Sequence, residues 1–262
     1  MKLTRSQSQA HATAQEILAS GNAHGIDERR AVIDRWHEGA NHNNAASSAF
    51  FTPWDIGYHL ALNVPNGGKL LDLCSGIGAL TIAVLDHGQQ FDEIVLVEIN
   101  PDYCEVARKL LPHAEVICGS IYDPQIMRDL AGRGFRTVIS NPPFGTVSKP
   151  KGAQSPRYKG DAHYEAIDFA SDLADYGAFI LPQQACPFAY SGRQCFERVD
   201  NPRYDKFSKN TGIELELGTS TDTSVLTPFR STTITVEIVT ADFIEAKERR
   251  QASQSDLFDI AA

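Results

Sequence analysis

The feature that most constrains the fold is a regular alternation of short apolar runs and helical patterns that starts near residue 68. Five β-rich apolar runs occupy residues 69–74, 93–99, 115–120, 136–141 and 178–183. Helical patterns lie between them at residues 79–88, 101–112, 124–134 and 161–176. Strands that alternate with helices at this spacing predict a parallel sheet covered by helices on both faces.

Two later stretches, 212–218 and 232–240, alternate polar and apolar residues with period two. They predict an antiparallel pair at one edge of the sheet. The expected fold class is therefore α/β: a Rossmann-like, doubly wound, mostly parallel seven-stranded sheet with an antiparallel edge hairpin.

The flanking segments differ from this core in composition. Residues 1–47 are polar, with one amphipathic piece at 28–36, and predict a helical extension and linker. The main domain is expected over 48–245. Residues 246–262 predict the end of a charged helix followed by a flexible tail. Residues 186–212, which are aromatic and basic, are expected to be irregular.

Charge and cysteine content limit the possible functions. The net charge is −9, so a polyanionic partner must be met by a local basic patch. Five cysteines without CxxC spacing predict buried free thiols in a reducing compartment, and no metal site is expected. The chain has no secretory apolar region and no run near the roughly 20 residues of a membrane span. A cytoplasmic protein without membrane contact is expected.

A glycine turn with two acids predicts a nucleoside pocket. Gly76 and Gly78 follow the first strand and allow a ligand to approach the backbone closely. Asp72, at the end of that strand, could receive a cationic amino group, and Glu98, at the end of the second strand, could accept both ribose hydroxyls. Thr81 stands where a dinucleotide fingerprint would need a third glycine. S-adenosylmethionine fits this pocket better than a dinucleotide does.

The stretch Asn141–Pro142–Pro143–Phe144, which ends the fourth strand, predicts a site that grips a planar amine. The Asn141 side-chain carbonyl and the Pro142 backbone carbonyl could accept both amine hydrogens and expose the nitrogen lone pair. The prolines would hold these acceptors rigid. Phe144 could stack on a base, an interaction worth roughly 1–3 kcal/mol. A purely structural turn is the alternative.

Taken together, these motifs resemble the class I S-adenosylmethionine-dependent methyltransferases, and more narrowly the N6-adenine type with an Asn-Pro-Pro-Phe loop. The likeness covers about residues 48–185 and follows the γ order of motifs. A Phe-Phe-Thr-Pro stretch is similar to the segment that covers the cofactor in bacterial DNA adenine methyltransferases, which implies cofactor contacts for Phe51, Thr52 and Pro53. The chain departs from the family at Ser120, where an acid is usual, and it has no long DNA-reading domain. The predicted cofactor site also includes Ser75, Ile99, Ser120, Ile121 and Asn141.

Two basic segments are candidates for substrate contact. The loop after Phe144 carries Lys149, Lys151, Arg157 and Lys159 without an acid and is expected to be mobile. Arg193, Arg198, Arg203, Lys206 and Lys209 alternate with Phe196, Tyr204 and Phe207, a mixture that suits a flipped base and its strand. Tyr204 or Phe207 could pack on the base. Alternatively these aromatics pack inward. His113 and His163 are expected at the surface.

The stretch Gln254–Phe258 resembles the pentapeptide with which bacterial replication and repair proteins dock on the sliding clamp. Leu257 and Phe258 would fill an apolar pocket, with Gln254 and Asp256 completing the motif. Such a tether would raise the local concentration of the enzyme at DNA.

The resulting hypothesis is a bacterial, phage or plasmid enzyme that methylates the N6 amine of adenine in DNA, with S-adenosylmethionine as the cofactor. An RNA (rRNA) N6-adenine methyltransferase, a protein glutamine N5-methyltransferase and an inactive nucleic-acid-binding module remain open. The loop chemistry alone does not separate adenine from cytosine.

Overall fold

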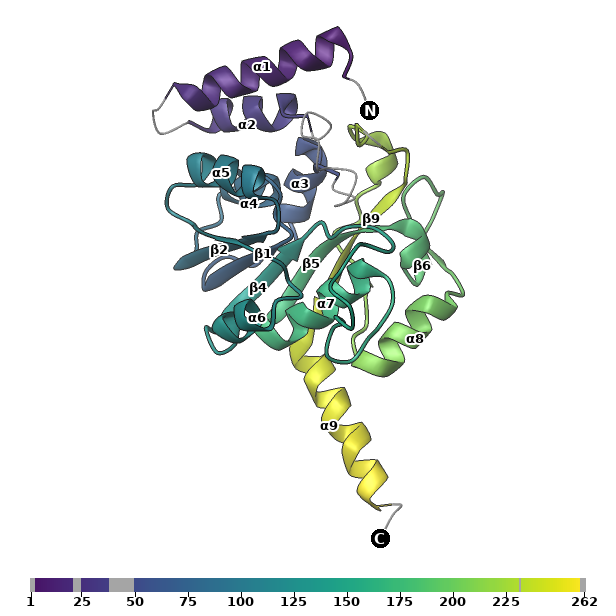
Figure 1. The fold of residues 1–262 in the computed structure, drawn as a ribbon. Coiled ribbons are helices and arrows are strands. Elements are labelled where there is room, and N and C mark those ends of the chain that lie inside the picture. The colour runs from purple at the N-terminus through teal and green to yellow at the C-terminus, as the bar shows by residue number, and fades with distance from the viewer. Residues whose placement is uncertain (1–2, 21–24, 38–49, 231, 260–262) are drawn as a thin grey trace.

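The computed structural model describes residues 3–20, 25–37, 50–230 and 232–259 (Figure 1). Its centre is a sheet of order β3-β2-β1-β4-β5-β9-β8. The strands are β1 (Lys69–Leu73), β2 (Glu93–Glu98), β3 (Glu115–Cys118), β4 (Phe135–Ser140), β5 (Ala174–Pro182), β8 (Glu216–Leu217) and β9 (Val236–Asp242). The predicted seven-stranded, mostly parallel sheet is thus confirmed.

The strand order places a topological switch at β1. This strand pairs in parallel with β2 on one side and with β4 on the other. The chain therefore builds the sheet outward from β1 in one direction through β2 and β3, and then returns to continue it in the other direction with β4 and β5. β9 pairs antiparallel with β5, and β8 with β9. Ligands of such sheets bind outside the carboxyl ends of the strands at the switch. The predicted edge pair exists, although its two strands are shorter than the period-two patterns suggest.

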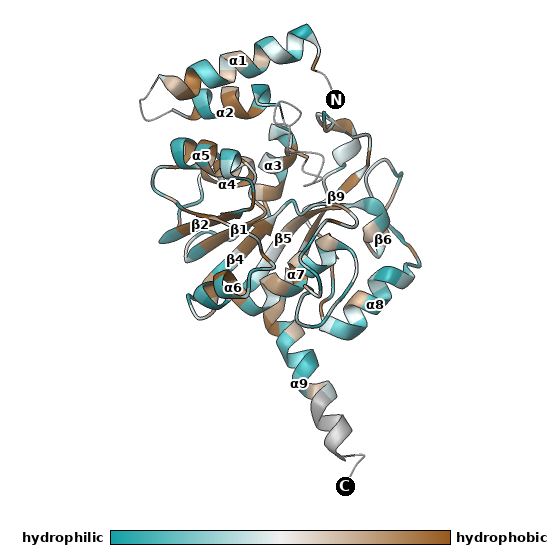
Figure 2. Ribbon diagram, in the orientation of Figure 1, coloured by the Kyte–Doolittle hydropathy of each residue, from teal (hydrophilic) through white to brown (hydrophobic). Residues whose placement is uncertain are grey.

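Helices cover both faces of the sheet, and Figure 2 shows the strands as the apolar centre of the fold. One face carries α3 (Trp54–Ala61), α4 (Ala79–Asp86) and α5 (Pro101–Leu110). The other carries α6 (Pro124–Leu130), α7 (Ala162–Leu173), α8 (Pro202–Thr211) and the start of α9 (Phe243–Asp259). Short 3-10 helices at Gln183–Ala185 and Thr223–Val225 and a small hairpin of β6 (Phe188–Ala189) and β7 (Glu197–Arg198) complete the domain.

The N-terminal extension forms two helices, α1 (Arg5–Ala19) and α2 (Ile26–Arg35), which pack on the α4 and α5 layer. Ala14 and Leu18 of α1 share a buried cluster with Val32 and Ile33 of α2 and with residues of α4 and α5. Arg230 donates to the backbone carbonyls of Ile33 and Asp34 at the end of α2, at 2.9 and 2.6 Å. The predicted helices are therefore part of the core. The predicted linker lies mostly outside the described residues.

Three helices begin with the same local signal, an Asn or Asp followed by proline. The side chains of Asn100, Asp123 and Asn201 accept hydrogen bonds from the backbone of the first turn, and proline takes the first helical position. Proline fits there because its missing N–H has no helical partner at that position. The third of these helices, α8, lies in the segment expected to be irregular, so that expectation was wrong.

The last helix, α9, leaves the sheet after β9 and projects from the body of the domain (Figure 1). It continues to Asp259, so residues 254–258, where the clamp-like motif lies, belong to its last turns. Among the described residues, no helix is both long and apolar enough to cross a membrane. Cys104 and Cys186 are buried, but Cys118 and Cys195 are exposed, which corrects the expectation of a uniformly buried set.

Candidate cofactor and amine site

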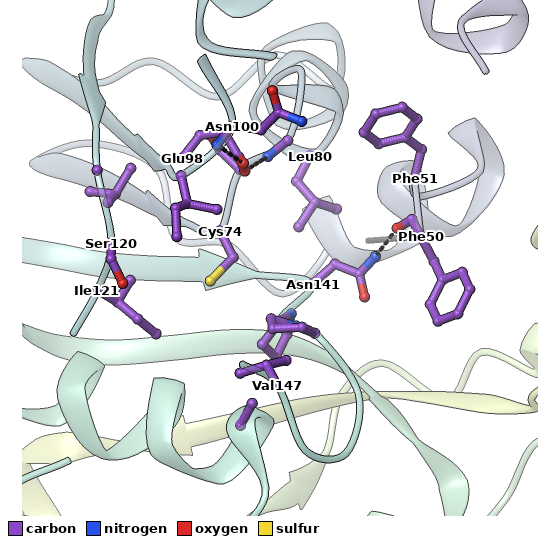
Figure 3. Close-up of a pocket in the computed structure, with 18 of the residues that line it drawn as sticks. Phe50, Phe51, Cys74, Leu80, Glu98, Asn100, Ser120, Ile121, Asn141 and Val147 are labelled. Carbon is purple, nitrogen blue, oxygen red and sulfur yellow. Dashed lines mark hydrogen bonds between the residues drawn. The ribbon is translucent and has the colours of Figure 1, made fainter. Parts of the chain in front are cut away.

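A cavity of about 400 Å³ opens where the carboxyl ends of β1, β2 and β4 meet (Figure 3). Its position is the crevice expected at the switch of strand order, and its volume lies in the range of small-molecule sites. Nine of the twelve predicted cofactor residues line it: Phe51, Thr52, Ser75, Gly76, Glu98, Ile99, Ser120, Ile121 and Asn141. The motifs that the sequence places far apart thus converge on one cavity.

Three predicted cofactor residues lie behind the walls instead. Pro53 precedes the first turn of α3. Gly78 has a positive φ of 84°, and a Cβ there would approach Leu111 Cδ1 to 2.8 Å. Its absent side chain therefore serves the packing of the turn. Asp72 has no exposed surface and is described below.

The turn after β1 brings backbone to the cavity at Gly76. This residue and Cys74 both have φ near 58°, a left-handed conformation that glycine adopts easily and cysteine rarely does. A Cβ on Gly76 would approach the Phe51 ring to 3.2 Å. Glycine therefore keeps this wall open and lets the ring of Phe51 lie against it.

Glu98 is fixed by backbone donors from two sides. Its Oε2 accepts from Gly76 N at 2.8 Å and its Oε1 from Asn100 N at 2.7 Å (Figure 3). Burial raises the pKa of this carboxyl, and the backbone donors partly offset that effect. A carboxylate has about four acceptor positions, so each oxygen can still accept from a hydroxyl group. This geometry suits the predicted recognition of two ribose hydroxyls.

Asp72 is a buried acid with one free oxygen. Its Oδ2 accepts from the Thr81 hydroxyl at 2.7 Å, whereas its Oδ1 has no hydrogen-bond partner among the described residues. Burial raises the pKa of this carboxyl to about 7. Thr81, which replaces the third glycine of a dinucleotide fingerprint, is therefore the residue that orients Asp72.

The side-chain amide of Asn141 is held in one orientation. Its Nδ2 donates to Phe50 O at 2.9 Å and to Thr52 Oγ1 at 3.0 Å. Its Oδ1 is shielded from solvent and has no partner among the described residues. Figure 3 shows the nitrogen turned toward Phe50 and the oxygen turned away from it. The amide therefore presents an acceptor to the cavity, as the sequence predicts.

The other residues of the Asn141–Phe144 stretch, here called the amine loop, differ in whether they face the cavity. Pro142 and Pro143 line the cavity beside Asn141. Phe144 does not line it, because its ring packs between Phe50 and Phe229, with centroid distances of 5.9 and 6.4 Å. Phe50, which the sequence analysis did not select, lines the cavity in its place.

Lys149, predicted to contact substrate, belongs to a buried ion pair. Its Nζ lies 2.6 Å from both oxygens of Glu165, a side chain with no exposed surface. The same carboxylate accepts from Tyr122 Oη at 2.6 Å and from Gly160 N at 3.0 Å. Glu165 therefore ties the loop after Phe144 to α7 and to the segment between β3 and α6. The loop contains no acid of its own, but Glu165 of α7 pairs with the charge of Lys149.

Arg157 is engaged in the same way. Its guanidinium donates to the buried Asp168 at 3.0 Å and also pairs with Asp172. Asp168 accepts in addition from Ser155 Oγ and from the backbone of Arg157 and Tyr158. This places a second anchor between the loop and α7. Lys151 and Lys159 are the two loop cations that remain exposed.

Tyr204 and Phe207 of α8 do not face the cavity. They are 8% and 0% exposed, and the Phe207 ring stacks on Tyr164 at a centroid distance of 4.6 Å. Tyr204 Oη accepts from Leu215 N at 3.0 Å. The alternative, that these aromatics pack inward, is correct, because helix α8 turns its apolar side to the core.

Sequence reasoning missed several residues near the site. Asn100 and Tyr122 line the cavity just after β2 and β3, and a position directly after a parallel strand was the available signal. His163, expected at the surface, is 4% exposed, and burial lowers its pKa to about 4. Gly145 N approaches its Nδ1 at 3.4 Å, so the neutral ring supports the turn after Phe144.

Comparison with known proteins finds a family match in the central part of the chain. Residues 55–154 match the family described as the methyltransferase small domain. The match runs from α3 through the glycine turn and the amine loop, and so takes in most of the cavity wall. The sequence-based prediction of a methyltransferase that uses S-adenosylmethionine agrees with it.

Individual relatives extend this result. The release factor glutamine methyltransferase of Mycolicibacterium smegmatis is 32% identical over 97 residues, which is 36% of this chain and 32% of that protein. The match spans about a third of the length of the curated relatives. A class I S-adenosylmethionine-dependent methyltransferase structure from Listeria monocytogenes has a TM-score of 0.54 at 13% identity, covering 92% of this chain and 81% of that one. A type I restriction-modification methyltransferase subunit from Streptococcus thermophilus has a TM-score of 0.52 at 16% identity, covering 86% and 51%. These structures establish the methyltransferase fold.

Proposed function

We propose that this protein transfers a methyl group from S-adenosylmethionine to the exocyclic N6 amine of adenine in DNA. The observation that carries the proposal is the amide of Asn141. Its nitrogen is held by two acceptors, and its oxygen is buried in the cavity wall without a partner among the described residues. A buried acceptor without a donor costs free energy, on the order of 1–3 kcal/mol. A ligand that carries an N–H group removes that cost.

The residues around the cavity fit S-adenosylmethionine. Glu98 retains acceptor positions for hydroxyl groups, and Asp72 has a free oxygen behind the turn that could attract a cationic amino group. The wall is mostly apolar around these groups, which suits an adenine ring and a thioether chain. When bound, this cofactor supplies a methyl group on a positively charged sulfur.

The residues of the amine loop account for the rest of the chemistry. Asn141 Oδ1 and the carbonyl of Pro142 accept the two amine hydrogens and draw the nitrogen out of conjugation with the ring. Acceptors that are fixed in advance need no reorganisation during the reaction. The nitrogen then forms its bond to carbon as the carbon–sulfur bond breaks. The extra proton leaves to solvent, so no base with a shifted pKa is required.

Support for DNA as the substrate comes from the sequence. The Phe-Phe-Thr-Pro stretch, through Phe50 and Thr52, supplies both acceptors that hold Asn141. This stretch resembles the cofactor-covering segment of DNA adenine methyltransferases, and in this chain it also fixes the orientation of the Asn141 amide. RNA with an accessible adenine is the nearest alternative substrate.

Expression in a bacterial host that lacks DNA methylation tests the proposal. Long-read sequencing of the host genome should reveal N6-methyladenine in a defined context with the wild-type chain and none with Asn141→Ala. Lys109→Ala, which changes an exposed residue of α5, is the matched control and should leave the pattern intact. An unmodified genome in the presence of a folded wild-type protein would contradict the choice of DNA.

A second candidate is methylation of a glutamine side-chain amide in a protein. The identity of 32% to a release factor glutamine methyltransferase favours it, although the match covers only about a third of that enzyme. Phe144 argues against it, because the corresponding loops usually end in tyrosine. Incubation of the purified chain with labelled donor and either DNA, RNA or a release factor, followed by separation of the products, distinguishes the three.

The clamp-like motif remains a separate proposal about partners. Residues 254–258 lie at the end of a helix that projects from the domain, where a large ring-shaped partner would find room. A peptide of residues 247–262 should bind a bacterial sliding clamp, and Phe258→Ala should abolish that binding. A peptide that does not bind, or that binds equally well after the substitution, would refute it.

A further inference from the structure

We propose that a groove beside the amine site binds the backbone phosphates of the nucleic acid strand that carries the target adenine. The inference rests on the proposed function and adds a location to it. The groove measures about 510 Å³ and lies between the loop at residues 146–161 and helix α8. It is separate from the cofactor cavity, with which it shares no lining residue.

The charge of the groove is opposite to that of the whole chain. Lys159, Arg203 and Lys206 face it, with Asp161 as the opposing acid. Lys149 also lines it, but Glu165 neutralises that charge. Among the described residues, Lys159 and Lys206 have no carboxylate partner within salt-bridge distance. A chain with a net charge of −9 thus keeps a local excess of cations at this one face of the site, as an acidic protein that binds a polyanion must.

The cations stand on a rigid support. Lys206 Nζ lies 5.7 Å from the centre of the Tyr158 ring, and that ring packs at 5.6 Å on the buried Phe207. The buried aromatics of α8, which do not reach the amine site, therefore fix the helix that presents Arg203 and Lys206. The first turn of α8 also faces the groove at Pro202, and the positive end of a helix dipole favours an anion there.

Arg203 is available to a phosphate. Its side chain is 79% exposed, and its Nη1 lies 3.6 Å from Asp161 Oδ2. An ion pair at such exposure contributes little, so a phosphate can take the place of the carboxylate at small cost. Arginine can then bind two phosphate oxygens at once.

The groove and the cavity are adjacent at two points of the chain. Thr146 lines the groove and Val147 lines the cavity, and the same holds for Asp161 and Ala162. Neighbouring Cα atoms are about 3.8 Å apart, so at these two points only one thickness of the chain separates the groove from the cavity. A base held at Asn141 thus leaves its own backbone at the entrance to the groove.

Binding of a short fluorescein-labelled DNA duplex by the full chain, measured over a series of salt concentrations, tests the inference. The double variant Arg203→Ala/Lys206→Ala should weaken binding at least about tenfold. It should also reduce the slope of log Kd against log salt by about 0.9 for each phosphate that the variant no longer neutralises. The paired substitution Lys109→Ala/Arg128→Ala is the matched control: it also removes one lysine and one arginine, at exposed positions of α5 and α6 outside the groove.

The outcomes separate the groove from the function. An unchanged slope in the double variant, or an equal weakening in the control Lys109→Ala/Arg128→Ala, overturns the groove while DNA methylation by the wild type can still stand. An RNA of the same sequence that binds more tightly than DNA, and loses that affinity in the double variant, supports the groove and overturns DNA as the substrate. Wild-type protein that binds neither nucleic acid overturns both proposals. Unchanged thermal unfolding and cofactor affinity in the double variant confirm that the fold is intact.

Discussion

The buried polar groups beside the cavity and those beneath the loop at residues 146–161 differ in how completely they are hydrogen-bonded. Glu165 and Asp168 of α7 accept hydrogen bonds on both carboxylate oxygens from the loop that covers them. Asp72 and Asn141, at the ends of β1 and β4, each keep a buried oxygen without a partner among the described residues. Buried polar groups in proteins are normally hydrogen-bonded, and Glu165 and Asp168 follow this rule as groups that hold structure. The oxygens of Gln89 and Thr137 are also unpaired but belong to residues that do not line the cavity, so it is the position of Asp72 and Asn141 at the strand ends beside the cavity that makes their free oxygens candidates for contact with a ligand.

The comparison predicts that Glu165→Ala has the largest effect, and that the effect is on stability. Removal of this carboxylate leaves Lys149, which is 19% exposed, without its partner and frees the Tyr122 hydroxyl. Loss of one member of a buried ion pair costs about 3–5 kcal/mol, which thermal or urea unfolding would detect. Glu105→Ala, which breaks the exposed pair with Arg108, should cost less than about 1 kcal/mol. Equal costs in the two variants would refute the assignment of Glu165 as a structural anchor.

Asn141→Ala should do the opposite, with a large effect on catalysis and a small one on stability. Loss of a preorganised group at the reacting centre lowers kcat by about 10²–10³. The substitution also removes an orphaned oxygen, which offsets the loss of the two hydrogen bonds donated by Nδ2. Single-turnover methylation measures the chemical step, and unfolding measures stability. A variant that unfolds easily but methylates at the wild-type rate would reverse the roles assigned to the two regions.

Asp72→Asn tests whether this buried acid serves stability or ligand binding, because the substitution should change the unfolding temperature and the cofactor affinity in ways that depend on pH. Burial raises the folded pKa of Asp72 to about 7, above the value of 3.8 for an exposed aspartate. The unfolded chain therefore loses this proton first, so the contribution of Asp72 to stability is greatest below about pH 4, declines as the pH rises to 7 and stays low above it. The amide carries no charge and can still accept from Thr81. At pH 8 the variant should thus unfold at a higher temperature than the wild type, with the advantage gone near pH 4.

The same variant should bind S-adenosylmethionine about tenfold more weakly at pH 8, because the cationic amino group of the cofactor then meets a neutral amide instead of a carboxylate. Isothermal titration of the donor gives this value directly. Unchanged affinity at pH 8 would make Asp72 a purely structural residue, in keeping with its position behind the cavity wall.

The two regions also differ in how far the sequence predicted them. Gly76, Glu98 and Asn141 occupy ends of parallel strands, and the fold brings all such ends to one edge of the sheet. Their order along the chain was therefore enough to place them together. Whether Lys149 and Arg157 are free to contact substrate depends on carboxylates of α7 that lie 11 to 16 residues further along the chain. A count of charges along a loop contains no information about such partners.

Two other differences between prediction and structure concern helix α8 and Phe144. Helix α8 was not predicted, although Asn201–Pro202 repeats the start signal of two helices that were predicted. Its mixture of aromatic and basic residues is also typical of an irregular nucleic-acid-binding segment. Phe144 was expected to face a base, but the sequence does not reveal that Phe50 and Phe229 lie on either side of its ring. Side-chain destinations of this kind are decided by tertiary packing.

The smallest expected effect concerns Thr52, which tests whether an orphaned oxygen must also be aimed. The Thr52 hydroxyl accepts one of the two hydrogen bonds that fix the Asn141 amide. Thr52→Val keeps the shape of the side chain but leaves Phe50 O as the only acceptor of the two, so the amide can turn its nitrogen toward the cavity more often. One neutral hydrogen bond is worth about 1 kcal/mol, so kcat should fall about fivefold to tenfold.

Thr52→Ser, which restores the acceptor, should recover most of that decrease. The affinity for S-adenosylmethionine should stay the same in both variants if Thr52 acts through Asn141. A weaker affinity with an unchanged kcat would instead make Thr52 a direct cofactor contact, as its resemblance to the cofactor-covering segment implies.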